Sequence, residues 1–133
     1  PTFFKNYLQP VISRLVNKFP NKLGYYSKGT QNSFFNNEFK SLPLAGQGYD
    51  HRCFLPDILK QTQRGFVQGN FDQSLLHMDN SDFKKMLSIY INEMKELTFE
   101  QRAGWVSGLG HGVLPKTPER NVKEFVEMIR KEF

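Results

Sequence analysis

The side chain that first suggests a chemical role is His111, which lies in a glycine-rich turn at residues 108–112. A short apolar run at 105–106 precedes this turn, and a helical pattern follows Thr117. An imidazole titrates near neutral pH, so it can hold or transfer a proton. Folds with parallel strands build their sites just beyond the carboxyl ends of those strands. The spacing therefore makes His111 a candidate site residue, against the alternative of a loop histidine whose neighbouring glycines merely form the turn.

Polar residues also gather at the end of another predicted strand, in the segment 68–72, QGNFD. In the functional interpretation, the Gly69-Asn70 backbone and the Asn70 side chain help to line the floor of a pocket. In the alternative, Asn70 and Asp72 are ordinary turn and cap residues, a role that their short polar side chains favour.

The two remaining predicted strands end at Lys28 and Asp50, and both side chains would face the same mouth. For Lys28 a solvated position is the simpler expectation, because lysines are usually exposed.

Two motif interpretations, a dinucleotide-binding loop and a zinc site, do not fit the sequence. A dinucleotide fingerprint needs G-x-G-x-x-G before a helix and an acidic residue about 20 positions later, which the glycines at 108–112 do not provide. His51-Arg52-Cys53 resembles half of a zinc site, but Cys53 is the only cysteine. The four-coordinate set of nitrogen and sulfur ligands that zinc prefers cannot be completed. We therefore expect neither a nucleotide cofactor nor a metal.

Helical and strand patterns alternate along the chain. Apolar spacing predicts a first helix over 2–19, which Pro10 should kink or restart. Strands are predicted at 23–27, 44–50, 65–69 and 104–107, and helical segments at 32–40, 57–60, 73–77, 83–97 and 118–131. Ser81-Asp82 is expected to cap the helix over 83–97. Thr117 is expected to cap the last helix, with Pro118 at its first position.

This alternation predicts an α/β fold in which helices pack outside a parallel sheet. A closed (β/α)₈ barrel needs about 250 residues, and the chain has 133. We therefore expect residues 1–133 to form a single partial-barrel domain, the C-terminal half of a TIM barrel with about four βα units.

Composition narrows the function classes. The net charge is +5, but the lysines and arginines are scattered, so nucleic-acid binding is not favoured. No run approaches the roughly 20 apolar residues of a membrane span, and no signal-peptide pattern opens the chain. The single cysteine fits a reducing compartment, so a cytoplasmic location is expected. Because the chain begins at Pro1, we expect it to be processed, trimmed or a designed fragment.

Two motifs in the expected order resemble those of the uroporphyrinogen decarboxylase family. One is GLGHG at 108–112, followed by Leu114-Pro115, Thr117-Pro118 and Asn121-Val122. The other is VQGNFD at 67–72. The resemblance runs from Phe3 to Val126 and fits the last part of such a protein. It departs from the family pattern at Gly108, where the family usually has asparagine.

The resemblance implies a cofactor-free decarboxylase of haem biosynthesis. Such an enzyme removes carboxyl groups from the four acetate side chains of uroporphyrinogen III to give coproporphyrinogen III. It also implies that His111 lies in the tetrapyrrole pocket and contacts substrate carboxylates. We therefore expect His111 and Gly110, with Gly69 and Asn70, to bind substrate, and we assign no catalytic residue.

The family's arginine-rich motif, its pyrrole-binding aspartate and its pocket tyrosine and serine have no matching positions here, so we expect the chain alone to be inactive. One alternative is a half-barrel assembly module that forms a homodimer or pairs with an N-terminal half, since open sheet edges invite pairing. Another is a relative of the corrinoid- and coenzyme M-linked methyltransferases. Their zinc motif is not matched, because the chain reads Tyr26-Ser27-Lys28 where it would be expected.

Overall fold

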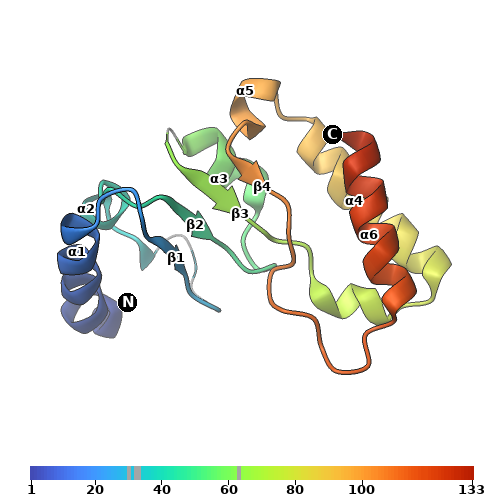
Figure 1. Ribbon diagram of the computed structural model, residues 1–133, viewed down its shortest axis with the longest axis horizontal. Coiled ribbons are helices and arrows are strands. Elements are labelled where there is room, and N and C mark those ends of the chain that lie inside the picture. The colour runs from blue at the N-terminus through green and yellow to red at the C-terminus, as the bar shows by residue number, and fades with distance from the viewer. Residues whose placement is uncertain (30, 32–33, 63) are drawn as a thin grey trace.

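The computed structural model describes residues 1–29, 31, 34–62 and 64–133, and a parallel sheet of four strands lies at its centre (Figure 1). The strands are β1 (Gly24–Tyr26), β2 (Gly46–Gly48), β3 (Phe66–Gln68) and β4 (Trp105–Val106). They lie side by side in the order of the sequence, each parallel to the next. Doubly wound sheets reverse their strand order, whereas a barrel adds each strand on the same side of the last. The predicted α/β partial barrel is confirmed.

Helices follow the strands as the alternation predicted. In chain order they are η1 (Phe4–Leu8), α1 (Gln9–Lys18), α2 (Asn37–Lys40), α3 (Leu55–Gln61), η3 (Gln73–His77), α4 (Asn80–Lys95), α5 (Phe99–Arg102) and α6 (Glu119–Glu132). In Figure 1, α1 and α2 lie beside β1 at one end of the sheet, and α4 and α6 pack together at the other.

The first helix restarts at its proline, as predicted. The chain forms a π-helical turn over Phe4–Leu8 and continues as an α-helix from Gln9, with Pro10 in the first turn. A proline is tolerated there because its missing N–H group needs no intrahelical partner.

The helix expected over 32–40 is shorter in the structure and begins at Asn37. The side chain of Asn36 caps it by accepting a hydrogen bond of 2.8 Å from the backbone N–H of Phe39. Residues 32 and 33 lie outside the described part of the chain. α5 was not predicted, although Thr98 and Gln101 form a capping box at its start, and that spacing is readable in the sequence.

Both predicted N-caps were wrong. α4 begins at Asn80, so Ser81 and Asp82 lie inside its first turn instead of before it. Pro118 is the N-cap of α6, one position from where it was expected. The hydroxyl of Thr117 is used elsewhere, because it donates to the carbonyl of Leu114 at 2.6 Å.

The two faces of the sheet differ in what covers them. Tyr25, Val67 and Trp105 share one face by register and pack in or against the buried core beneath the helices. Tyr26, Gly48, Gln68 and Val106 share the other face. This second face corresponds to the interior of a barrel, and here the side chains of Tyr26 and Val106 are 47% and 44% exposed.

Candidate functional site

Several positions on the inner face of the sheet are glycines, and aromatic rings occupy the space where side chains would otherwise lie. A Cβ atom at Gly46 would lie 2.3 Å from the ring of Phe66, and one at Gly24 would lie 3.1 Å from the same ring. A Cβ atom at Gly48 would lie 3.0 Å from the ring of Tyr26. Over β1 and β2 the inner surface therefore consists of backbone and two aromatic rings in place of the branched aliphatic layers that fill most barrel interiors.

A cavity of about 660 Å³ opens over this surface. Its described lining residues are Gly24, Tyr25, Tyr26, Gly48, Tyr49, Phe66, Gln68, Leu109, Gly110, His111 and Gly112. Most of them lie at or beyond the carboxyl ends of the strands, where sites of this class of fold are found. The structure thus brings two of the predicted site residues, Gly110 and His111, to one cavity.

The loop that carries His111 continues β4 along β3. The N–H of Phe71 donates to the carbonyl of Gly108 at 3.0 Å, and the N–H of Gly110 donates to the carbonyl of Phe71 at 2.7 Å. From the opposite side, the hydroxyl of Tyr26 donates to the carbonyl of Gly110 at 2.8 Å. His111 follows directly and is half-buried; its Nδ1 atom is buried with no hydrogen-bond partner among the described residues.

Gly110 has to be glycine for packing reasons. A Cβ atom there would lie 2.5 Å from the backbone nitrogen of His51 and 3.1 Å from the carbonyl oxygen of Asn70. Gly112, two residues later, has open space where a Cβ atom would be. The His111 loop is therefore packed tightly against its neighbours at Gly110 and has open space at Gly112.

Gly69 and Asn70 form a buried frame beneath this loop. The Nδ2 atom of Asn70 donates to the carbonyls of Asp50 at 2.8 Å and Cys53 at 2.6 Å. The carbonyl of Gly69 accepts from Trp105 Nε1 at 2.9 Å, and the peptide bond that joins Gly69 to Asn70 is cis. Neither residue is among the described residues that line the His111 cavity. Their direct contact with a substrate stays a prediction, and the structure shows them supporting the loop.

Asp50 and Lys28 differ sharply in environment. Asp50 is 2% exposed, and its carboxylate accepts hydrogen bonds from the backbone N–H of Gly29 and of Arg52 and from Arg52 Nη1. Burial alone would raise the pKa of Asp50. The two backbone hydrogen bonds and the charges of Arg52 and His51 outweigh it and hold the pKa below its usual value. Asp50 thus joins the ends of β1 and β2, whereas Lys28 is exposed.

His51 and Cys53 do not come together with a metal-binding set. The Nε2 atom of His51 lies 3.9 Å from Asp72 Oδ2, and Cys53 accepts the hydrogen bond from Asn70 through its backbone. Among the described residues, no group of three or more His, Cys, Asp or Glu side chains is arranged to hold a metal ion.

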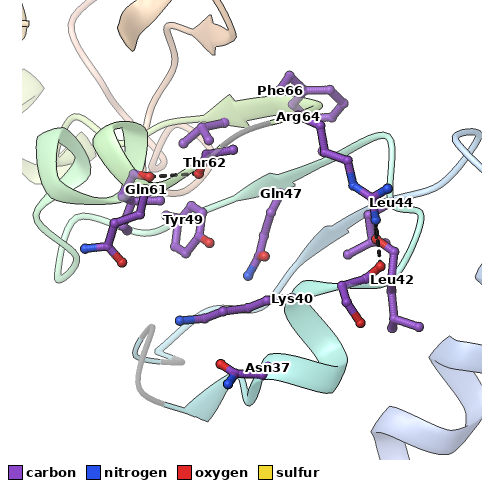
Figure 2. A pocket seen from close by; sticks show the side chains of 14 residues that line it. Asn37, Lys40, Leu42, Leu44, Gln47, Tyr49, Gln61, Thr62, Arg64 and Phe66 are labelled. Carbon is purple, nitrogen blue, oxygen red and sulfur yellow. Dashed lines mark hydrogen bonds between the residues drawn. The ribbon is translucent and has the colours of Figure 1, made fainter.

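A second cavity, of about 680 Å³, lies between α2 and α3 (Figure 2). Gly46 and Phe66, which line it, are the first residues of β2 and β3, so it lies at the amino-terminal edge of the sheet. Figure 2 shows Arg64 reaching toward Leu42, and its Nη2 atom donates to the carbonyls of Ser41 and Leu42 at 2.6 and 2.9 Å. In barrels, the amino-terminal face serves stability and the carboxyl face serves chemistry. The His111 cavity is therefore the candidate site.

Tyr26 and Gln68 are among the cavity residues that were not assigned to the site from sequence. Tyr26 and Gln68 share the inner face with Gly48, and Gln68 reaches over Gly108, whose Cβ position would lie 3.7 Å from its amide nitrogen. The available signal was the two-residue period of strands, which puts both residues at strand ends on one face.

The sheet, its strand order and a cavity at the carboxyl edge define a partial (β/α) barrel with a candidate site at its mouth. The uroporphyrinogen decarboxylase family model matches residues 1–132. The chain belongs to the uroporphyrinogen decarboxylase family.

Curated relatives named uroporphyrinogen decarboxylase are similar to this chain. The protein from Chlamydia trachomatis is 33% identical over 99 residues, which cover 71% of this chain and 28% of the relative. The protein from Rickettsia akari is 34% identical over 91 residues, which cover 68% of this chain and 25% of the relative. The protein from Orientia tsutsugamushi is 26% identical over 121 residues, which cover 90% of this chain and 34% of the relative. The chain thus spans about a third or less of the length of these relatives.

The described part of the chain contains no helix with the length and apolar character needed to cross a membrane.

Proposed function

We propose that this chain forms the C-terminal part of a uroporphyrinogen decarboxylase, which converts uroporphyrinogen III to coproporphyrinogen III. The observation that carries the proposal is the position of His111, which lines a cavity at the carboxyl edge of the sheet. The family membership and the names of the relatives support the same reaction class.

The cavity suits a large ligand with a flat apolar body and a charged edge. Its floor is glycine backbone with the rings of Tyr26 and Phe66, which allow close approach of a macrocycle. Its rim carries His111 and Gln68, which supply polar groups for carboxylate side chains. Residues 1–37 carry lysines and an arginine but no Asp or Glu, a charge balance that favours a polyanion.

In the proposed reaction a pyrrole ring of the substrate accepts the electron pair that decarboxylation releases, so no metal or organic cofactor takes part. Protonation of an electron-rich pyrrole makes it an electron sink. The bond from the side-chain carbon to the carboxyl group breaks, its electron pair moves into the ring and carbon dioxide leaves. The side-chain carbon then gains a proton and the ring loses the proton it took up, which restores the pyrrole. The protein's part is to position the substrate and stabilise charge, which is electrostatic preorganisation. In this scheme His111 binds and orients a substrate carboxylate by a hydrogen bond.

The proposal also requires the rest of the barrel. The matched relatives are about three times longer, and the family's remaining pocket groups have no matching positions here. We therefore expect the chain alone to bind substrate weakly and to lack turnover. We expect the complete domain to act in the cytoplasm.

A second candidate role, assembly through an open face, rests on a row of exposed apolar side chains along η1 and α1 and at their two ends. Phe3, Tyr7, Val11, Leu15 and Phe19 recur every four residues, and the first two are 66% and 65% exposed. Residues four apart lie on one face of a helix. Such a row fits contact with the preceding part of a barrel or with a second copy of the chain. Sedimentation of the purified chain tests this role, because a strict monomer would count against self-association.

The test of the proposed function is conversion of uroporphyrinogen III, followed by chromatography of the oxidised porphyrin products. A polypeptide that carries this chain within a complete family domain should yield coproporphyrin, and the 133-residue chain should not. A folded complete domain that leaves uroporphyrinogen III unchanged would contradict the proposal.

A further inference from the structure

We infer that Tyr26 is a positioning residue for His111: its hydroxyl fixes the peptide group between Gly110 and His111 and so sets the direction in which the histidine enters the cavity. The inference rests on the proposed role of His111, and its test separates the two.

The hydrogen bond from Tyr26 to Gly110 joins segments that are 84 residues apart in sequence. Tyr26 is the last residue of β1, the first strand of the sheet, and Gly110 lies beyond β4, the last. The ring of Tyr26 packs over Gly48, on the intervening strand β2. The hydroxyl thus reaches across the mouth of the cavity from a ring that the sheet itself holds in place.

Gly110 is already fixed on its other sides. Its N–H donates to the carbonyl of Phe71 at 2.7 Å, and its Cα is packed so closely that an added Cβ would touch the backbone of His51 and Asn70. What these contacts leave open is rotation about the Cα–C bond of Gly110, which glycine permits more readily than other residues.

The hydrogen bond from Tyr26 restricts this rotation about the Cα–C bond of Gly110. The peptide unit is planar, so the direction of the Gly110 carbonyl also determines the positions of the His111 nitrogen and Cα. After Gly110, the next backbone hydrogen bond in this loop is from Thr117 to Leu114. Within the described residues, Tyr26 is therefore the side-chain contact closest to His111 that orients its backbone.

Tyr26 is suited to this task over the physiological pH range. Burial of its hydroxyl raises the pKa of Tyr26 above its ordinary value; the charge of Asp50 adds to the rise, and that of Arg52 opposes it. The phenol stays protonated, so it remains a donor to the carbonyl. A phenylalanine at this position would keep the ring on Gly48 and lose only the hydrogen bond.

The test is a double-mutant cycle in a complete family domain that carries this chain, with Tyr26→Phe, His111→Ala and both together. Uroporphyrin III is the probe, and the readout is quenching of its fluorescence as protein is added. One neutral hydrogen bond corresponds to about a two- to twelvefold change in affinity, so Tyr26→Phe should weaken binding by that factor. In the His111→Ala background the same change should have no effect, because Tyr26 acts through His111. Ser81→Ala removes an exposed hydroxyl on α4, outside the cavity, and serves as the control.

A second readout does not depend on ligand binding. The chain has three histidines, so the ring signals of His111 can be assigned by NMR from the His51→Gln and His77→Gln variants. Tyr26→Phe should shift or broaden the His111 ring signals and leave those of His77 unchanged; Tyr7→Phe should move neither.

The outcomes separate the two claims. If His111→Ala weakens binding but Tyr26→Phe does not, or if the two effects simply add, the positioning role is wrong and the role of His111 stands. If the complete domain does not bind uroporphyrin, or binds it equally without His111, the proposed site fails. The NMR comparison then decides the positioning role: unchanged His111 signals in Tyr26→Phe would overturn it.

Discussion

The hydroxyl of Tyr90 lies 2.9 Å from the backbone nitrogen of Asn70, from which it accepts a hydrogen bond in the buried interior. The same hydroxyl donates to the carbonyl of Gly69 at 2.8 Å. One side chain on α4 thus satisfies both polar groups of the peptide that begins the turn after β3. Because burial raises the pKa of Tyr90, the hydroxyl keeps its proton and can perform both tasks.

We predict that Tyr90→Phe lowers the free energy of unfolding by about 1–3 kcal/mol, the cost of leaving a buried backbone group without a partner. Chemical denaturation measures the effect. Tyr7→Phe removes an equivalent hydroxyl from an exposed position and should change stability little. Equal stabilities for the two variants would show that the Tyr90 hydroxyl is not needed for the turn.

Gly110→Ala and Gly112→Ala should behave very differently despite lying two residues apart. At Gly110 the new Cβ would meet the backbone of His51 at 2.5 Å, so the loop has to move. At Gly112 it would meet nothing within 4 Å. We predict that Gly110→Ala lowers stability by about 1–3 kcal/mol, the usual cost of overpacking, and weakens uroporphyrin binding. Similar stability and binding in the two variants would contradict the tight packing.

The buried carboxylate of Asp50 predicts a loss of stability in acid. Its pKa is held below the ordinary aspartate value of about 3.9, so its contribution is complete above that pH and disappears as the pH falls through the folded-state pKa. Asp50→Asn should therefore lower stability at pH 7 and flatten the decline below about pH 4. Unfolding curves across pH measure both effects. Asp57→Asn is the control, because the Asp57 side chain is 63% exposed; an unchanged acid limb in Asp50→Asn would contradict the account.

The hydrogen bonds of Asn121, on α6, predict that this residue contributes to stability. Its Nδ2 atom donates to the carbonyls of Leu76 and Met78 at 2.9 and 3.0 Å, and its Oδ1 atom accepts from Asn80 at 2.8 Å. Asn121→Asp keeps the shape but places a carboxylate beside two carbonyls. The unfolding free energy should fall by about 1–3 kcal/mol or more.

Asn92→Asp is the control for this variant, because Asn92 is exposed on α4. Equal denaturation midpoints for Asn121→Asp and Asn92→Asp would rule out the anchoring role of Asn121.

The α/β architecture could be predicted because the hydrophobic period changes along the chain, from helical spacing in 2–19 to short runs such as 65–69. Helix boundaries were harder to predict from the sequence, because they depend on which hydrogen-bond partner a capping side chain finds in the folded protein. Thr117 is a good cap by type, yet its hydroxyl is held by Leu114 and lies 3.0 Å from His77 Nε2, forty residues away.

The glycines of β2 show a similar limit. Gly46 and Gly48 weakened the strand prediction for 44–50, because glycine lacks a side chain to pack. The structure gives their reason, since the rings of Phe66 and Tyr26 from the neighbouring strands fill those places. Packing between strands that are twenty residues apart cannot be derived from local pattern.

The candidate site could be predicted in part. Gly110 and His111 follow from a local motif and do meet at one cavity. The hydrogen bond that holds them comes from Tyr26, at a separation of 84 residues that no local spacing encodes. Asn70 was chosen by its place at a strand end, but its side chain turns to the carbonyls of Asp50 and Cys53.

The most direct test of the central claim is the effect of His111→Ala on kcat/KM for uroporphyrinogen III, measured in a complete domain that contains this chain. Loss of a hydrogen bond to a charged substrate group should lower kcat/KM by about 10- to 150-fold. His111→Gln, whose amide can still donate, should recover part of the loss, and His77→Ala should have no effect. Wild-type kcat/KM in a folded His111→Ala domain would contradict the placement of this histidine against the substrate.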